Sequence, residues 1–356
     1  MMSRPPALLL GIPVDDLTMD EAVDVIGHLV DRGRTTSNHH QIATVNLDFL
    51  TNALDHELVR RRLQEATVCL PDGTPPLWAA AALGMPLRER VAGSDLVPRL
   101  FEAAAERSWN IHCLGSSVDV ASGVERLVAE QHPTAAITVD PGPLIGPEGE
   151  APEDLIDEIR AREPDILLVA LGHPKQEHFI ATHGERLGVP VMVGIGGTLD
   201  LLVGKRVRAP RWVRSIGLEW AYRAAQEPRR LVPRYARDLY VAVPAICQQW
   251  VGSRRPGDGR WQVIASDRGV CLSWNRTSTG HPDATGYGDA VAAIRAGAPL
   301  TIDIASGIPG DADIAQLVGL WRVCRLYDRE IVWEPAPDVR LGERLMALAL
   351  PSLESD

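Results

Sequence analysis

The sequence predicts an α/β protein, in which a Rossmann-like, mostly parallel sheet with helices on both faces is followed by a smaller C-terminal α/β domain. Short apolar runs alternate with amphipathic helical stretches over the first two-thirds of the chain. Because each strand is followed by a helix, the connections are crossovers, which are right-handed and give a parallel sheet covered on both faces. Several apolar runs also end in glycine-containing loops before a helix, as in sheets that bind ligands at their carboxyl edge.

The predicted strands and helices follow one another in chain order. The apolar runs that predict strands are HHQIATVNL, ATVCLP, NIHCLG, AAITVD, DILLVALG and VPVMVGIGG. The helices between them are predicted over Met19–Arg32, Ser94–Arg107, Val118–Gln131, Pro152–Arg162 and Gln176–Leu187. A shorter apolar run from Ala7 to Ile12 predicts one further strand, because it is too short for the apolar core of a signal peptide.

Composition excludes several classes of protein. The 356 residues are 45% apolar, which is enough for one large or two ordinary domains with a sizeable core. A formal net charge of -11 argues against a general nucleic-acid binder. The five cysteines are scattered singly, without zinc or disulfide spacing, and fit a reducing compartment. No apolar stretch reaches the roughly 18–20 residues of a membrane span, so we expect a cytoplasmic protein.

The character of the chain changes near residue 205. Residues 205–237 carry ten Lys or Arg against two Asp or Glu in a helical pattern, and a more apolar helical tail continues to Val251. The sequence GSRRPGDG that follows is typical of a linker. These shifts predict a core over residues 1–204, a basic helical appendage that completes the site over 205–251, a linker over 252–259 and a separate domain over 260–356.

The last block has its own strand and helix pattern. WQVIASDRGVCLSWN predicts a hairpin with its turn at Asp267-Arg268-Gly269. PLTIDIAS predicts a buried strand, IAQLVGLWRVCRLY an amphipathic helix, REIVWEPA another strand and LGERLMALAL a final helix.

The densest pattern of potential functional residues is LVALGHPKQEHFIATH, residues 168–183. Gly172 lets the backbone approach a ligand closely, and Lys175 and Gln176 at a helix start can hold phosphate or sugar hydroxyls. Lys175 is one of only two lysines among 36 basic residues, which suggests that this position needs a compact ammonium group. The alternative is a helix start with solvated polar residues.

Three glycines follow the next predicted strand, Gly194, Gly196 and Gly197. This pattern alone occurs in many buried strand-to-helix turns. A nicotinamide dehydrogenase would need a third glycine opening a helix and an acidic residue about twenty positions later. An arginine-rich segment follows instead, so the sequence lacks the dinucleotide fingerprint.

Polar residues end two earlier strands. Asp72 follows a predicted strand and precedes Gly73, where a carboxylate can act as a base at the mouth of a sheet. An Asp-Gly turn is the commoner use of that dipeptide. Thr44 and Asn46 end another predicted strand, and by themselves they are equally consistent with a cap for the helix beginning near Leu47.

Taken together, these segments resemble the WecG/TagA/CpsF family of bacterial glycosyltransferases. The resemblance extends from residue 8 to about residue 245, in the family's order and spacing. It rests on TVNLDFL, PDGTPPLW, RERVAGSDL, LGSSVDV, ALGHPKQEHF, GIGGTLDLLVGK, RAPRWVRSIGLEWAYR and EPRRLVPRY.

The resemblance implies inverting, metal-independent transfer of an N-acetylhexosamine-type sugar from a UDP-sugar, with UDP-N-acetylmannosamine or a relative as typical donor. It implies an acceptor sugar on polyprenyl diphosphate, cell-surface polysaccharide synthesis, and no cofactor beyond the donor. A lipid-linked acceptor would hold the enzyme at the inner face of the cell membrane. Some family members self-associate, which leaves a homo-oligomer open.

The resemblance also implies roles for individual residues. Asp72 matches the proposed general base, Thr44 and Asn46 line the same pocket, Arg90 lies near phosphates, and Gln176 contacts the sugar. The expected donor and nucleotide site adds Gly115, Ser116, Gly172, Pro174, Lys175, Gly194, Gly196, Gly197 and Asp200. Arginines of the basic segment are expected to bind the leaving diphosphate or anionic lipid, the alternative being a solvated helix face; they are Arg211, Arg214, Arg223, Arg229, Arg230 and Arg234.

Two features depart from the family pattern. Thr74-Pro75-Pro76 stands where the family more often has a glycine and an aliphatic run, which bears on sugar preference. Residues 260–356 lie outside the family and weakly resemble a STAS domain of the anti-sigma-factor antagonist type. Gly310-Asp311-Ala312-Asp313 replaces its phosphorylatable serine, so an interaction module with a protein partner is expected. The rival hypothesis is a nucleotide-sugar sensor that acts through this domain, although a sensor needs no catalytic base.

Overall fold

A computed structural model describes residues 2–36, 38–210, 213, 217–253, 260–266, 269–275, 284–303 and 311–334. The chain divides into two compact units that do not follow chain order. The first spans Met1–Asp16, Leu77–Arg88 and Ala242–Asp356, and the second spans Leu17–Pro76 and Glu89–Val241.

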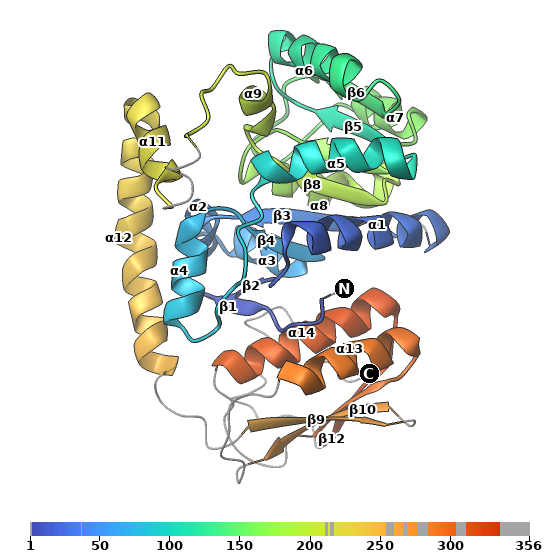
Figure 1. The fold of residues 1–356 in the computed structure, drawn as a ribbon, viewed down its shortest axis with the longest axis vertical. Helices are drawn as coiled ribbons and strands as arrows, with labels where there is room; N and C mark the ends of the chain where they lie inside the picture. The colour runs from blue at the N-terminus through green and yellow to red at the C-terminus, as the bar shows by residue number, and fades with distance from the viewer. Residues whose placement is uncertain are drawn as a thin grey trace. The chain divides into compact units, whose positions relative to one another are not determined.

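The second unit is built on a six-stranded parallel sheet (Figure 1). Its strand order is β4-β3-β8-β7-β5-β6. The strands are β3 (His40–Val45), β4 (Val68–Pro71), β5 (Asn110–Leu114), β6 (Ala136–Asp140), β7 (Ile166–Val169) and β8 (Val191–Gly194). Every residue of β3, β4, β7 and β8 is buried. These strands are therefore covered on both faces, as the unbroken apolar runs of the sequence predict.

The helices of this unit lie between the strands in sequence. They are α1 (Met19–Thr36), α2 (Leu47–Asp55), α3 (Glu57–Glu65), α5 (Gly93–Arg107), α6 (Val118–Gln131), α7 (Glu153–Ala161), α8 (Lys175–Leu187), α9 (Thr198–Leu202) and α11 (Glu219–Gln226). Two more, α4 (Thr74–Ala82) and α12 (Pro228–Ser253), begin in it. The predicted helices and the fold class are confirmed, with helix ends shifted by a few residues.

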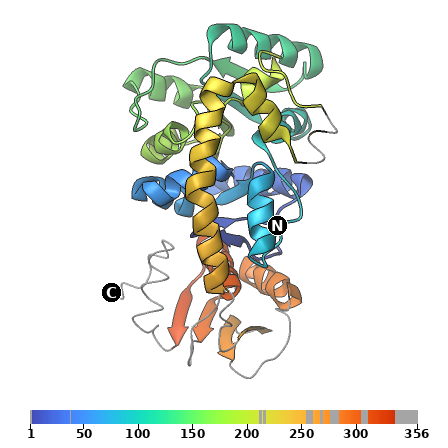
Figure 2. The same ribbon diagram turned by 90° about the vertical axis from the view of Figure 1, so that its left-hand side faces the viewer.

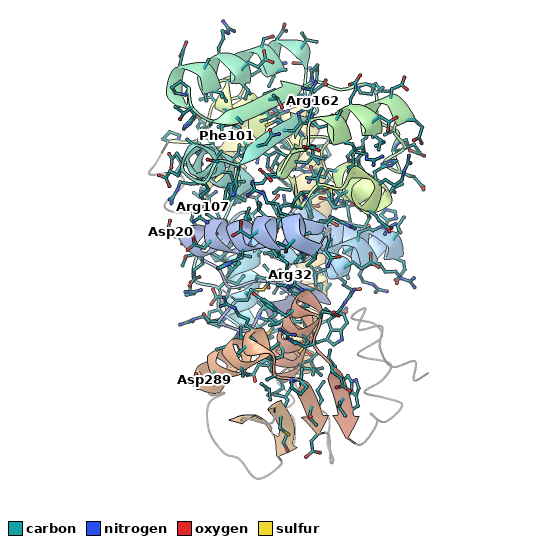
Figure 3. The ribbon with its side chains drawn as sticks, turned by 90° about the vertical axis from the view of Figure 1, so that its right-hand side faces the viewer. Asp20, Arg32, Phe101, Arg107, Arg162 and Asp289 are labelled. Carbon is teal, nitrogen blue, oxygen red and sulfur yellow. The ribbon has the colours of Figure 1, made fainter. Side chains whose placement is uncertain are left out.

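Apolar packing fixes these helices on the sheet. Leu155, Ile156 and Ile159 of α7 share one buried cluster with Phe179 of α8 and Val169 of β7. Helices α1 and α5 pack on each other in the same unit. Their surface ion pairs join Arg99 to Asp20 at 2.7 Å and Arg107 to Asp24 at 2.7 Å. Figure 3 labels Asp20 on α1 and Phe101 and Arg107 on α5.

The first unit contains a four-stranded sheet of order β12-β11-β10-β9. Its strands are β9 (Arg260–Ser266), β10 (Gly269–Asn275), β11 (Leu300–Asp303) and β12 (Ile331–Glu334). β9 and β10 form the predicted antiparallel hairpin, and β10, β11 and β12 pair in parallel. Helices α13 (Ala284–Ala296) and α14 (Asp311–Tyr327) pack against each other and against this sheet. The predicted final helix over 341–350 lies outside the described residues.

The N-terminus of the chain folds with this sheet unit. One strand was expected from Ala7 to Ile12, but the segment forms two, β1 (Ala7–Leu9) and β2 (Ile12–Val14). Leu10 and Gly11 have φ of 52° and 83°, a turn that reverses the chain into an antiparallel pair. A buried ion pair, Arg322 Nη1 to Asp15 Oδ1 at 2.9 Å, ties the segment after the hairpin to α14.

The part of the chain that the structure describes has no helix with both the length and the apolar character of a membrane span.

Candidate active site

Asp72 and Asn46 lie at the carboxyl edge of the six-stranded sheet, where two paired strands end. Val45 of β3 stands opposite Pro71 of β4. The Asp72 N–H donates to the Val45 carbonyl at 2.8 Å, which carries the pairing one residue beyond the strand. Gly73 then adopts a φ of 102°, and the chain turns into α4. Asp72 therefore begins an Asp-Gly turn and also lies at the carboxyl edge of the sheet, so the two interpretations of this residue are compatible.

Burial raises the pKa of Asp72 from 3.8 to about 6. Arg223 and Arg90 oppose this shift because their positive charges favour the carboxylate, whereas Glu219 and Asp95 add to it. A carboxyl group with a pKa near 6 is largely ionised at neutral pH and is more basic than an ordinary aspartate. It therefore has the property that a general base needs.

Arg90 is held beside Asp72 by two carboxylates. The Val91 N–H donates to the Pro71 carbonyl at 2.9 Å, which places this segment along the end of β4. Arg90 Nη1 donates to Glu219 Oε2 at 2.7 Å, and Nη2 donates to Asp95 Oδ2 at 2.8 Å. Its side chain is 23% exposed, so the guanidinium is oriented by the protein and still accessible. A fork held in this way suits recognition of phosphate oxygens.

The Gly194–Gly197 loop closes against the start of α5. Thr44 Oγ1 donates to the Gly194 carbonyl at 3.0 Å. A Cβ at Gly93 would lie 3.3 Å from Thr198 Oγ1 and 3.8 Å from Thr44 Cγ2, so the helix start and the loop are in close contact. The structure thus brings the ends of β3 and β8 and the start of α5 together at one edge.

The hydrogen bonds of Asn46 and Gln176 lie within the protein. Asn46 Oδ1 accepts from the N–H groups of Asp48 at 3.0 Å and Phe49 at 3.4 Å, so this side chain caps α2. Gln176 is 1% exposed, and its Oε1 accepts from the Gly196 N–H at 2.9 Å. Their roles toward substrate stay predictions.

The other strand ends carry the remaining predicted residues. Gly115 and Ser116 follow β5 with φ of 101° and 104°, and Ser117 accepts from Lys205 Nζ at 3.0 Å. Lys175 Nζ donates to the Ile145 carbonyl at 3.0 Å, which fixes the loop before α7. Gly172 has a φ of 77° with open space around its Cα.

Several arginines of the basic segment form ion pairs, and another lies near Asp72. Arg206 pairs with Asp200 at 3.4 Å and with Glu227 at 3.4 Å, and Arg230 also pairs with Glu227, at 2.5 Å. Arg223 is close enough to Asp72 to lower its pKa. Arg211 and Arg214 lie outside the described residues.

Helix α12 is coloured yellow to orange in Figure 2. Side chains of its first turns contact α2 and α11. Arg234 pairs with Asp48 at 3.8 Å. Arg237 donates to Asn52 Oδ1 at 2.9 Å and to Asp55 Oδ2 at 2.6 Å. The basic segment therefore contacts the helix that Asn46 caps.

Four residues of the site were not predicted. Asp95 and Glu219 orient Arg90, and Asp95 also pairs with Arg208. Glu177 and His173 are hydrogen-bonded next to Gln176. Two signals were available in the sequence. Glu219 is one of only two acids in the basic segment, and Glu177 directly follows Gln176 in GHPKQE.

The model of the "Glycosyl transferase WecG/TagA/CpsF family" matches residues 7–256. The chain belongs to this family. The glycosyltransferase match includes the six-stranded sheet and ends before β9. The sheet of β9 to β12 is therefore outside the matched region, and its likeness to a STAS domain stays a prediction.

Similar proteins of known activity come from Staphylococcus aureus. Those of strains MW2 and NCTC 8325 / PS 47 are both named N-acetylglucosaminyldiphosphoundecaprenol N-acetyl-beta-D-mannosaminyltransferase. Each is 28% identical to this glycosyltransferase over 223 residues, which are 63% of this chain and 85% of the relative.

Proposed function

We propose that this glycosyltransferase moves an N-acetylhexosamine, of the N-acetylmannosamine type, from a UDP-sugar to a sugar on polyprenyl diphosphate during assembly of a cell-surface polysaccharide. The names of the staphylococcal relatives support the transferred sugar and the lipid-linked acceptor. The observation that carries the proposal is Asp72, a carboxyl group with a pKa of about 6 at the carboxyl edge of the sheet, beside Arg90 and Arg223.

The proposed reaction is a single displacement with inversion. The Asp72 carboxylate accepts the proton of the acceptor hydroxyl as that oxygen attacks the anomeric carbon of the donor. The new C–O bond forms on the face opposite UDP, the bond to the diphosphate oxygen breaks, and UDP leaves with its electron pair. One base is sufficient for this step because the departing diphosphate is a weak base and leaves without being protonated.

Negative charge that develops on the diphosphate needs fixed positive charge nearby. Arg90 is the best-placed cation, because Asp95 and Glu219 hold its guanidinium at 2.8 and 2.7 Å. Arg223 is the second, and the Gly197 N–H is the proposed neutral donor of the Gly194–Gly197 loop, because the Gly196 N–H already donates to Gln176. We propose that these groups replace a divalent cation. Undiminished transfer in excess EDTA is the expected result, and loss of transfer restored by Mg²⁺ or Mn²⁺ would contradict it.

The acceptor places the reaction at a membrane surface, and we propose peripheral association with its inner face. Exposed apolar side chains of α12, Val232, Leu239 and Tyr240, lie among the arginines of the same helix. Each basic residue near an anionic surface adds about 1 kcal/mol of attraction. Flotation with vesicles that contain anionic lipid, and less flotation with neutral vesicles, is expected; equal flotation would contradict the proposal.

The deciding experiment combines donor binding with turnover. Calorimetry with UDP and a panel of UDP-sugars should show binding with a preference for one N-acetylhexosamine. UDP release should then require an N-acetylglucosaminyl polyprenyl diphosphate. Asp72→Asn should keep donor binding and lose UDP release, while the exposed Asp119→Asn should keep both. A chain that binds neither UDP nor a UDP-sugar would overturn the proposed function.

A further inference from the structure

A buried chain of polar groups runs behind the Gly194–Gly197 loop. Glu177 Oε2 lies 2.8 Å from His173 Nδ1, and Glu177 Oε1 accepts from Gln176 Nε2 at 2.8 Å. Gln176 Oε1 in turn accepts from the Gly196 N–H at 2.9 Å. The Glu177 side chain is 1% exposed and that of His173 is 5% exposed. Water therefore contributes little to the orientation of these groups.

As a carboxylate, Glu177 fixes the direction of every hydrogen bond in this chain of polar groups. A carboxylate only accepts, so both of its partners must donate. Gln176 must therefore point its NH₂ group at Glu177 and its carbonyl oxygen at Gly196. His173 must carry its proton on Nδ1. Because a glutamine amide can otherwise be rotated by half a turn, Glu177 selects the orientation that offers an acceptor to the Gly196 N–H.

Neighbouring residues pack tightly against this chain of polar groups at both of its ends. A Cβ at Gly194 would lie 2.4 Å from Gln176 Nε2 and 3.0 Å from Glu177 Oε1, so only glycine fits beside these groups. At the other end, the ring of His173 stacks on Phe49 with centroids 3.7 Å apart. Phe49 lies in the first turn of α2, whose cap is Asn46. This chain of polar groups therefore connects the segments that follow β7, β8 and β3.

We propose that Glu177 is a positioning residue for the transfer reaction. Through the amide of Gln176 it sets the Gly196 backbone, and His173 holds the other carboxylate oxygen. Gln176 then serves the donor site by orienting this loop, without touching the sugar. The proposal rests on the proposed function, because the Gly194–Gly197 loop is assigned there to the leaving diphosphate.

The test uses the full chain with four variants and a matched control. Glu177→Leu removes both acceptors at similar volume, and Gln176→Met removes the acceptor for Gly196. His173→Asn keeps an N–H donor for Glu177, whereas His173→Phe keeps a stacking ring without a donor. Glu185→Gln changes an exposed acid on the same helix and serves as the control.

The first readout, amide hydrogen exchange of Gly196, requires no turnover. We expect exchange to accelerate about tenfold in Glu177→Leu and Gln176→Met, as loss of one hydrogen bond predicts. His173→Asn should be less affected than His173→Phe, and Glu185→Gln should match the parent chain. Unchanged Gly196 exchange in Glu177→Leu, measured while its thermal melt still shows a folded protein, would overturn the proposal.

The second readout is calorimetric affinity for UDP together with kcat and KM for the donor. Glu177→Leu and Gln176→Met should weaken UDP binding by similar factors of about ten to a hundred, as a misplaced loop predicts. The double variant should be no worse than either single one, because both act through Gly196. A Gln176→Met variant that keeps UDP affinity and Gly196 protection but loses kcat would mean direct contact with the sugar. If the parent chain releases no UDP, the proposed function fails, while exchange and affinity still decide the positioning role.

Discussion

The two halves of the sheet edge hold their functional groups in opposite ways. On the side of β4, Arg90 is shared between Asp95 and Glu219, and all three side chains are 16 to 27% exposed. On the side of β7 and β8, Glu177 is shared between Gln176 and His173, and all three side chains are almost fully buried. Each half has a central charge with two partners, but only the first is open to solvent.

This difference in burial fits the roles proposed for the two halves. A guanidinium that must meet phosphate oxygens has to keep part of its surface free, and solvent then weakens its ion pairs. A backbone loop that must stay in one conformation is better held by dry hydrogen bonds, which are strong because no water competes. We therefore expect substitutions on the β4 side to change activity more than stability, and those near Glu177 to change both.

The largest expected effect is on transfer by Asp72→Asn. Loss of the base should lower the rate by about 10²–10⁴-fold, and UDP affinity should change little. In the parent chain, activity should fall as pH drops through about 6, because protonation of Asp72 removes the base. A pH profile of kcat/KM for the donor, recorded for the parent chain and for Asp72→Asn, measures the rate loss and the pH dependence. An acid limb that persists unchanged in the residual activity of Asp72→Asn would assign the titration to another group.

The next effect is on stability and compares the loss of one acidic side chain from each half. Glu177→Leu leaves a buried amide and imidazole without their acceptor and should lower the free energy of unfolding by about 2–4 kcal/mol. Glu219→Leu should cost about 1 kcal/mol or less, because Arg90 keeps Asp95 and some contact with water. Urea unfolding of both variants measures the difference. Equal losses would remove the distinction between the two halves.

A third prediction concerns the stability cost of the base itself. The pKa of Asp72 is raised on folding, so the native state binds its proton more tightly than the unfolded state does. Stability is then lost as pH rises from about 4 to about 6, and the cost is fully present above that range. Asp72→Asn should be about 1–3 kcal/mol more stable than the parent at pH 7.5, and the gain should shrink toward pH 4. A variant less stable than the parent at pH 7.5 would contradict this.

The smallest prediction contrasts Glu177 with another buried carboxylate, Asp238 of α12, which is 1% exposed. Burial and the charge of Asp48 raise its pKa to about 6, against the effect of Arg234 and Arg237. Its two oxygens accept no hydrogen bond within 3.5 Å among the described residues, although Thr51 is close enough to lower the pKa somewhat. Asp238→Asn should therefore raise stability by about 1–2 kcal/mol at pH 7.5, the opposite sign to Glu177→Leu. Thermal melts at pH 7.5 and pH 4 check the sign of the effect and its decrease at low pH.

The strands and helices were largely predictable because they depend on local patterns. The apolar runs gave all six strands of the larger sheet, and the helical stretches gave α1, α5, α6, α7 and α8. The exception is the N-terminal run, where the reversal at Leu10 is hidden because leucine rarely adopts a positive φ. Short helices such as α3 and α4 were also missed, since nine residues carry little periodic signal.

The sequence by itself determined the α/β class and the order of its elements, because these depend on residue type and short-range spacing. Its resemblance to the family identified Asp72, Asn46 and Arg90 as candidates. Tertiary structure alone decided which carboxylates hold Arg90, since Glu219 is 129 residues away along the chain. It also decided that Gln176 faces Gly196, twenty residues away, with Glu177 behind it. Such pairings form only after parallel strands bring distant loops to one edge, and burial there sets the pKa of Asp72.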